Sequence, residues 1–130
     1  MALCACTQLA DLKPTEQTAV VRAGTWGKVY RGGNVEVSSV SGAPQWRLRS
    51  AMQVPDGERS ALLAVFLCNT DPKHCIPIAQ AQVSFRAEAG HTYRARARER
   101  LHGSNRFWVW LEDEATGKVA GGTAPRTPDS

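Results

Sequence analysis

Two neighbouring stretches of the chain carry cationic and aromatic side chains at every second position. In residues 92–100 and 106–112 these side chains are Arg94, Arg96, Arg98 and Arg100, then Trp108 and Trp110. The planar guanidinium group binds phosphate, sulfate and carboxylate through paired N–H donors, and indole faces stack on sugar rings or bases. If both stretches are strands, the alternation places these side chains on one face. The spacing therefore predicts binding of an anionic group.

The loop between the two stretches determines how they would pair. With residues 102–104 as the connection of a hairpin, Ala97 opposes Val109 and Ala95 opposes Leu111 on the inner face. The outer pairs are then Arg98 with Trp108, Arg96 with Trp110, and Arg94 with Glu112. In this register the arginines lie on the outer face, where they can form cation–π contacts and an ion pair, whereas the opposite orientation would bury them. We therefore predict that the tryptophans face outward. The alternative is a solvated face whose positive charge only prevents edge association.

The chain has four cysteines, and two of them bracket a polar turn. Asp71-Pro72 lies midway between Cys68 and Cys75, and apolar runs flank the segment, which predicts a tip between two strands with a disulfide across its base. A ring of this size adds about 2.5 kcal/mol of stability. Reduced thiols are one alternative. A metal site with His74 and Asp71 is another, although it lacks a second ligand pair at suitable spacing. The disulfide implies an oxidising compartment.

The first residues, Met1–Thr7, resemble the end of a bacterial lipoprotein signal. In that family Leu, a tolerated residue and a small residue precede the lipidated cysteine, and Leu3-Cys4-Ala5-Cys6 matches with Cys6 as the acceptor. The resemblance implies that the reading frame begins upstream of Met1, because no basic and apolar leader precedes the match. Residues 1–18 would then be a signal remnant and a polar tether, and the protein would be attached to a membrane through lipid on Cys6.

The composition is that of one ordinary globular domain. The 130 residues are 42% hydrophobic and 22% charged, and the net charge of +4 permits nucleic-acid binding without requiring it. No apolar run approaches the roughly 20 residues that span a bilayer. The sequence contains no glycine-rich phosphate loop, paired-histidine metal motif or nucleophile elbow. We therefore predict a non-catalytic protein without a metal or cofactor.

The chain from residue 19 to residue 122 has the pattern of an all-β domain. Short β-branched and aromatic runs alternate with glycine-bearing breaks, which predicts an antiparallel β-sandwich of about seven to nine short strands in a single domain, with a disordered tail over 123–130. The expected strands are 19–23, 27–30, 34–40, 46–52, 61–68, 76–88, 92–100, 106–112 and 118–121. A three-residue connection at 89–91 would pair Phe85 with Ala95 and Arg86 with Arg94, continuing one meander from 79 to 112.

A second resemblance lies in the middle of the chain. The turn Val54-Pro55-Asp56-Gly57 and the later Ala89-Gly90 resemble the turns of PEGA-type surface domains. The apolar residues that fit the same pattern are Leu62, Leu63, Val65, Leu67, Phe85 and Tyr93. The match covers residues 34–122, and small proteobacterial lipoproteins of unassigned role share it. It implies a sandwich and an envelope location, and it implies no reaction.

Together these features predict a domain at the periplasmic face of the bacterial envelope, lipid-anchored to the outer membrane through Cys6. Its role would be structural or binding, for anionic glycan or lipid head groups; the candidate ligand-binding residues are Arg94, Arg96, Arg98, Trp108 and Trp110. One alternative is nucleic-acid binding through residues 94–100 and the two tryptophans, with reduced cysteines as its marker. Another is a periplasmic hydrolase inhibitor, although a basic, lysozyme-like partner would be repelled by the charge of +4. No particular protein partner follows from the sequence.

Overall fold

The computed structural model describes residues 12–28, 31–43, 51–70 and 73–125. These residues form nine strands and no helix, and so include no helix of the length and apolarity needed to cross a membrane. The strands are β1 (Thr18–Arg22), β2 (Gly24–Lys28), β3 (Arg31–Val40), β4 (Ala51–Pro55), β5 (Gly57–Thr70), β6 (Lys73–Ala87), β7 (Thr92–Glu99), β8 (Phe107–Asp113) and β9 (Val119–Gly122). The prediction of an all-β single domain is confirmed.

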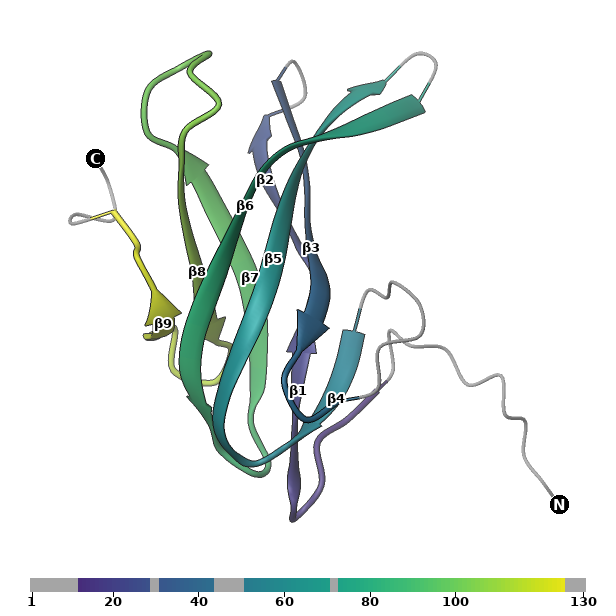
Figure 1. Ribbon diagram of the computed structural model, residues 1–130, viewed down its shortest axis with the longest axis vertical. Helices are drawn as coiled ribbons and strands as arrows, with labels where there is room; N and C mark the ends of the chain where they lie inside the picture. Colours follow the sequence, from purple (N-terminus) through teal and green to yellow (C-terminus); the bar gives the residue numbers. More distant parts are fainter. Residues whose placement is uncertain (1–11, 29–30, 44–50, 71–72, 126–130) are drawn as a thin grey trace, which may run out of the picture.

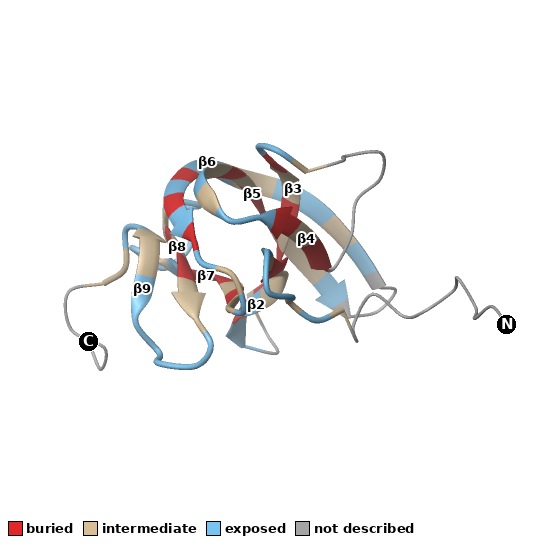
Figure 2. Ribbon diagram, turned by 90° about the horizontal axis from the view of Figure 1, so that it is seen from below, coloured by how far each residue is buried: buried red, intermediate tan, exposed pale blue. Residues whose placement is uncertain are grey.

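All nine strands belong to one sheet that curls around the core. Their order is β2-β3-β5-β6-β9-β8-β7-β1-β4, so hydrogen bonding is continuous from one edge to the other (Figure 1). Seen from below, the sheet arches over its buried residues (Figure 2). The separate second sheet of a sandwich is therefore not confirmed. The pairing is also not wholly antiparallel, because β1 pairs with β7 in parallel.

The longest hairpin, β5–β6, matches the predicted turn between two strands. Its ladder runs from Gly57 opposite Ala87 to Thr70 opposite Lys73, and it places Cys68 directly opposite Cys75. The two cysteines form a disulfide, as predicted, with their α-carbons 4.0 Å apart. Residues 71–72, which include Asp71 of the alternative metal site, lie outside the described residues.

The predicted pairing of β6 with β7 is wrong. Strand β6 pairs with β5 and β9, and β7 pairs with β8 and β1, so the connection between them crosses the core. Phe85 consequently packs edge-on against Tyr93, with ring centroids 5.4 Å apart, and does not pair with Ala95. The Tyr93 hydroxyl accepts a hydrogen bond from the backbone N–H of Glu88 (3.0 Å) and donates one to the carbonyl of Arg86 (3.3 Å), which ties down the crossing. Arg86 therefore does not lie beside Arg94.

The β1–β2 segment brings the curled sheet back on itself. Only Ala23 separates β1 from β2, yet β1 pairs with β7 and β2 pairs with β3. At Gly24 the chain passes so close to β7 that a Cβ would overlap the carbonyl oxygen of Ala95. Glycine is needed here for that close approach. The edge strand β2 therefore lies against β7, although the two strands are not neighbours in the hydrogen-bonded order.

Two strand predictions are displaced from the observed elements. The predicted strand 27–30 corresponds to β2, which occupies Gly24–Lys28, because Gly24 and Trp26 pair with Val35 and Gly33 of β3. The predicted strand 46–52 overlaps β4 only at residues 51 and 52, and β4 continues to Pro55 because it pairs with β1 as far as Thr18. Residues 44–50 lie outside the described residues.

Candidate functional site: an arginine and tryptophan face

The predicted register of β7 and β8 is confirmed. Arg98 pairs with Trp108, Arg96 with Trp110, and Arg94 with Glu112. The intervening residues, Ala95, Ala97, Val109 and Leu111, are buried in the core. Trp108 and Trp110 are partly exposed and lie outside the core cluster, on the outer side of the sheet. We call this outer surface the Arg/Trp face and define it by Arg96, Arg98, Arg100, Trp108 and Trp110.

The contacts on this side of the sheet run diagonally rather than straight across. The guanidinium carbon of Arg100 lies 4.1 Å from the centroid of the Trp108 ring. Arg96 Nε lies 3.4 Å from a carboxylate oxygen of Glu112, so the predicted Arg94–Glu112 ion pair is replaced. Long side chains on adjacent strands reach diagonal neighbours as readily as direct ones.

Arg94 has a structural role at the end of this side of the sheet. Its guanidinium lies 2.9 Å from the carboxylate of Glu114 and donates a hydrogen bond of 3.1 Å to the carbonyl of Ala23. The second contact joins β7 to the short link between β1 and β2. The guanidinium donors of Arg94 are therefore used in contacts within the protein, so we do not include Arg94 in the Arg/Trp face.

Arg98 and Arg100 are the cations of the face that remain uncompensated. Both side chains are exposed, and neither makes an ion pair within the described part of the chain. Arg96 is about half exposed, and its ion pair among the described residues is the 3.4 Å approach to Glu112. Positive charge is therefore concentrated around Arg98, where guanidinium donors are available to an anion.

Two shallow hollows lie on either side of Arg98. The lining of the Trp110 hollow, of about 390 Å³, includes Trp110, Arg96, Arg98 and one carboxylate, that of Glu112. The lining of the Trp108 hollow, of about 480 Å³, includes Trp108, Arg98, Arg100 and one carboxylate, that of Glu99. Both volumes fall within the range of roughly 300–1,000 Å³ that is typical of small-molecule sites.

The segment after β9 forms a wall of both hollows. Gly122 has a φ of +86°, a conformation that favours glycine, and it directs the chain alongside β8. The N–H of Thr123 then donates to the carbonyl of Val109 at 3.0 Å. Ala124 and Pro125, which the sequence places in the tail, line the Trp110 hollow and the Trp108 hollow alike.

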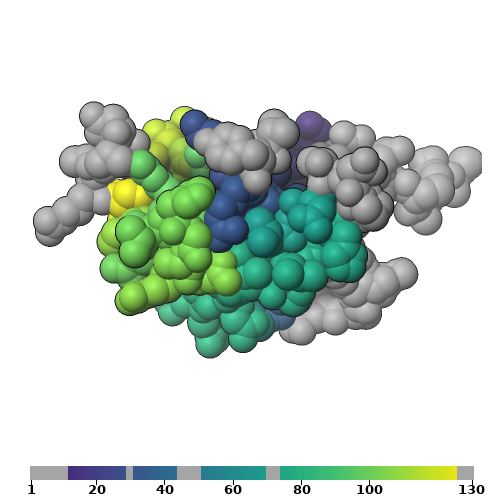
Figure 3. All heavy atoms as spheres, turned by 90° about the horizontal axis from the view of Figure 1, so that it is seen from above, coloured from purple at the N-terminus to yellow at the C-terminus, as the bar shows by residue number. Residues whose placement is uncertain are grey.

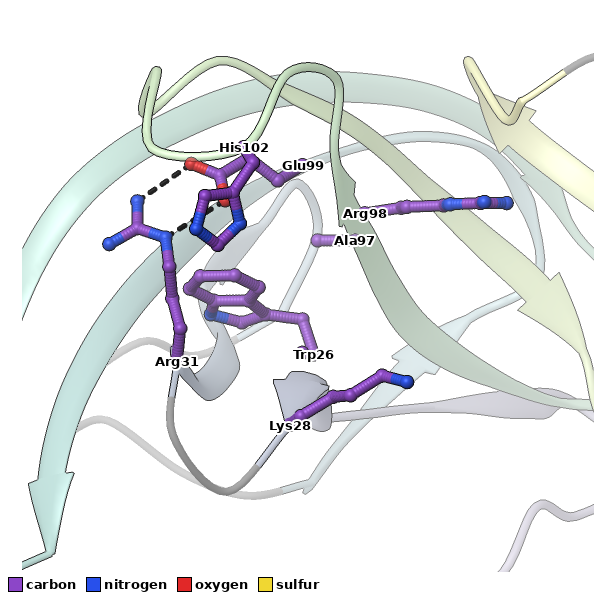
Figure 4. A pocket seen from close by; sticks show the side chains of 8 residues that line it. Trp26, Lys28, Arg31, Ala97, Arg98, Glu99 and His102 are labelled. Atoms are coloured by element: carbon purple, nitrogen blue, oxygen red, sulfur yellow. Dashed lines mark hydrogen bonds and ion pairs between the residues drawn. The ribbon is translucent and has the colours of Figure 1, made fainter. Parts of the chain in front are cut away.

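A third hollow, of about 310 Å³, lies between β2 and the end of β7 (Figure 4). We call it the seam hollow. Its lining includes Trp26, Lys28, Arg98 and His102. Lys28 and Arg98 extend to the right in Figure 4, whereas Arg31 and Glu99 lie on the left. Arg98 thus borders all three hollows.

An ion pair between Arg31 and Glu99 lines one side of the seam hollow and joins β3 to β7. Arg31 donates two hydrogen bonds, of 2.9 and 2.7 Å, to the two carboxylate oxygens of Glu99. The backbone N–H of Asn105 donates a third bond to Glu99, at 3.0 Å, from a left-handed conformation with φ of 60°. The Arg31 bonds are the main reason that the pKa of Glu99 is lowered to about 2. We call this group the Arg31–Glu99 clasp.

The clasp positions the loop after β7 over the beginning of β3. Viewed from this end of the molecule, the β7–β8 loop and the tip of β5–β6 lie on either side of the first residues of β3 (Figure 3). Trp26 packs beneath the loop, edge-on to Phe107 with ring centroids 4.7 Å apart, and its indole N–H donates to the carbonyl of Phe66 at 2.8 Å. The wall of the seam hollow is therefore fixed on both sides.

Four predicted residues come together here: Arg96, Arg98, Trp108 and Trp110. Arg100, which the alternation places on the same face and which belongs to the nucleic-acid alternative, borders the Trp108 hollow. Sequence reasoning missed Lys28. The sequence around Lys28 does not indicate a role in the site, because Lys28 comes close to the other residues only where β2 lies against β7.

The remaining predicted sites can be placed only in part. The predicted lipidation site, Cys6, lies outside the described residues. Within the described ranges, no group of three or more His, Cys, Asp and Glu side chains is arranged to hold a metal ion.

Comparison of the chain with protein-family models, with characterised proteins and with solved structures finds no match to any of them.

Proposed function

We propose that this protein is a non-catalytic binding domain that holds an anionic group, carried by a glycan or a lipid head group, on its Arg/Trp face. The observation that carries the proposal is the position of Arg98. Its exposed guanidinium makes no ion pair with any described residue, and it lies between two hollows that are each lined by a tryptophan.

The chemistry of the lining supports binding of this kind. A guanidinium group donates paired hydrogen bonds to carboxylate, sulfate or phosphate and keeps its charge at every physiological pH. Indole surfaces cover the apolar side of a sugar ring or a glycerol unit. Arginine and tryptophan therefore bind and orient a ligand without supplying a nucleophile or a base.

We further propose that the domain belongs to a PEGA-like lipoprotein at the periplasmic face of the envelope, anchored through Cys6. The disulfide between Cys68 and Cys75 supports an oxidising compartment, where such bonds persist. The resemblance of Leu3-Cys4-Ala5-Cys6 to a lipoprotein signal supports the anchor. Expression of the gene with its upstream sequence in a Gram-negative host should yield a membrane-associated protein acylated on Cys6, and unmodified soluble protein would refute the anchor.

Substitution of Arg98 tests the binding proposal. The variant Arg98→Gln should lose at least about tenfold in affinity for polygalacturonate or for vesicles containing phosphatidylglycerol, because a charge-assisted hydrogen bond is removed. Binding to only one of these probes identifies the carrier of the anionic group.

Arg86→Gln is the matched control. Arg86 is equally cationic and exposed, but it lies on β6 and pairs with Glu58 at 3.1 Å. Equal loss of binding in both variants would show that general positive charge, rather than the Arg/Trp face, attracts the probe. Failure of the unmodified protein to bind either probe would refute the proposed function.

A further inference from the structure

The three hollows that share Arg98 each add a further cation, and we call this set of hollows the basic track. The seam hollow contributes Lys28, the Trp110 hollow contributes Arg96, and the Trp108 hollow contributes Arg100. Arg98 lies at the border of all three hollows. Glu99 or Glu112 also lines each hollow, but basic side chains outnumber the acidic one in every case. A ligand with a single anionic group would need only one of them.

Lys28 is the accessible cation of the seam hollow. Arg31 is engaged by Glu99 in two hydrogen bonds and is only 20% exposed, so its charge is compensated. Lys28 is exposed and makes no ion pair with any residue in the described ranges. Its side chain extends to the same side as Arg98 (Figure 4). The seam hollow is therefore bordered by two uncompensated cations that come from different strands, β2 and β7.

We propose that the ligand of the Arg/Trp face is a linear acidic polysaccharide whose successive sugar units occupy neighbouring hollows, with Lys28 binding a unit beyond those held by the face itself. This inference rests on the proposed function and names its ligand class. A polymer with one carboxylate or sulfate on each ring presents anions at regular intervals, which matches cations distributed over adjacent hollows.

The aromatic groups favour an acidic glycan over nucleic acid. Single-stranded nucleic acid binds by stacking its bases on open aromatic faces. Here Arg100 covers the Trp108 ring at 4.1 Å, and Trp26 is only 6% exposed. Two of the three indoles, those of Trp26 and Trp108, are therefore covered, which leaves Trp110 as the open ring. One open ring flanked by cations suits a row of charged sugar units better than a row of stacked bases.

The length of the ligand is the variable that tests this inference. Binding of galacturonic acid and of its linear dimer, tetramer and hexamer would be measured by calorimetry. Affinity should rise with length and then level off, because linked units add contacts at high effective concentration until the track is filled. Lys28→Gln should weaken the hexamer about three- to five-fold, as expected for one exposed ionic contact, and leave the monomer unchanged. Arg98→Gln should weaken every length.

Lys13→Gln is the matched control, because Lys13 is exposed and lines none of the three hollows. It should bind the hexamer as the unmodified protein does. A hexamer that binds no better than the monomer, or that is insensitive to Lys28→Gln, would overturn the extended track and leave the proposed function standing.

Other outcomes overturn the ligand class. Tighter binding of oligodeoxythymidylate than of the hexamer at equal charge would identify nucleic acid as the ligand. Binding to phosphatidylglycerol vesicles without any binding to galacturonate oligomers would identify a lipid head group. Lack of binding to all of these probes would refute the proposed function together with the inference. Thermal melting of each variant confirms that a lost affinity is not a lost fold.

Discussion

At the scale of single residues, Glu99 should make the stability of the folded protein depend on pH. Its folded-state pKa is about 2, lowered from 4.5 chiefly by the hydrogen bonds from Arg31, so the folded protein holds the charged form more tightly than the unfolded chain does. The resulting stability is fully present above pH 4.5 and is lost as the pH falls toward 2. The Arg31–Glu99 clasp between β3 and β7 should therefore be detectable as a loss of stability at low pH.

The variant Glu99→Gln tests this pH dependence. It removes the charge from the clasp, so its melting temperature should lie below that of the unmodified protein at pH 7, and the gap should narrow as the pH falls through the interval from 4.5 to about 2. Glu58→Gln, which changes a carboxylate that is 75% exposed, is the control and should show little gap at any pH. A gap for Glu99→Gln that stays constant with pH would contradict this account.

Neighbouring residues of β8 should respond very differently to truncation. Leu111 is fully buried, so Leu111→Ala should cost about 2–5 kcal/mol of unfolding free energy. Trp110 lies on the outer side of the sheet and is partly exposed, so Trp110→Ala should cost less than Leu111→Ala, despite the larger side chain that is removed. Urea titration of the two variants measures the difference, and the reverse order would mean that β8 is turned the other way.

At the scale of elements, the β5–β6 hairpin depends on its disulfide. Replacing Cys68 and Cys75 together by serine should lower the free energy of unfolding by about 2–3 kcal/mol, because the unfolded chain gains the freedom that the small ring removes. Denaturant titration under non-reducing conditions measures the change. Mass spectrometry of the unmodified protein should show both cysteines in one linked peptide, and free thiols at both positions would refute the pairing.

The close contact between β2 and β7 also limits which residue can occupy position 24. Gly24→Ala should destabilise the protein by about 2–3 kcal/mol, since the added methyl group meets the backbone carbonyl of Ala95. Gly103→Ala is the control: its Cβ would enter open space, so only the positive φ of 78° opposes it, at a cost of about 1 kcal/mol. Equal melting temperatures for the two variants would contradict the close approach.

The elements that could be predicted are those whose partner lies next in the chain. The register of β7 with β8 follows from alternation and a short loop, because a shift by one residue would bury arginines such as Arg96. Alternation gives the same signal whether consecutive strands pair or cross the core, so the separation of β6 from β7 was not predictable. The partner that separates them, β9, comes later in the chain and pairs with β6 at Phe85. The parallel pairing of β1 with β7 has no local signal either.

At the scale of the whole molecule, the candidate site combines local and long-range parts. Arg98 and the two tryptophans were predicted because adjacent strands carry them. Lys28 and Pro125 were not predicted. Lys28 arrives by the return of the sheet edge, and Pro125 arrives by the turn at Gly122. A linear sequence does not show which distant segments a curled sheet brings together.

Under the proposed anchoring and ligand binding, the parallel pairing of β1 with β7 would have a mechanical consequence. Tension from an anchor at Cys6 would enter at the start of β1, at Thr18, whereas a ligand on the Arg/Trp face would pull on the far half of β7. Because the two strands run in the same direction, these forces act oppositely along their common axis. The load is then shared at once by the hydrogen bonds between Val20–Arg22 and Thr92–Arg94, in shear rather than by unzipping one bond at a time.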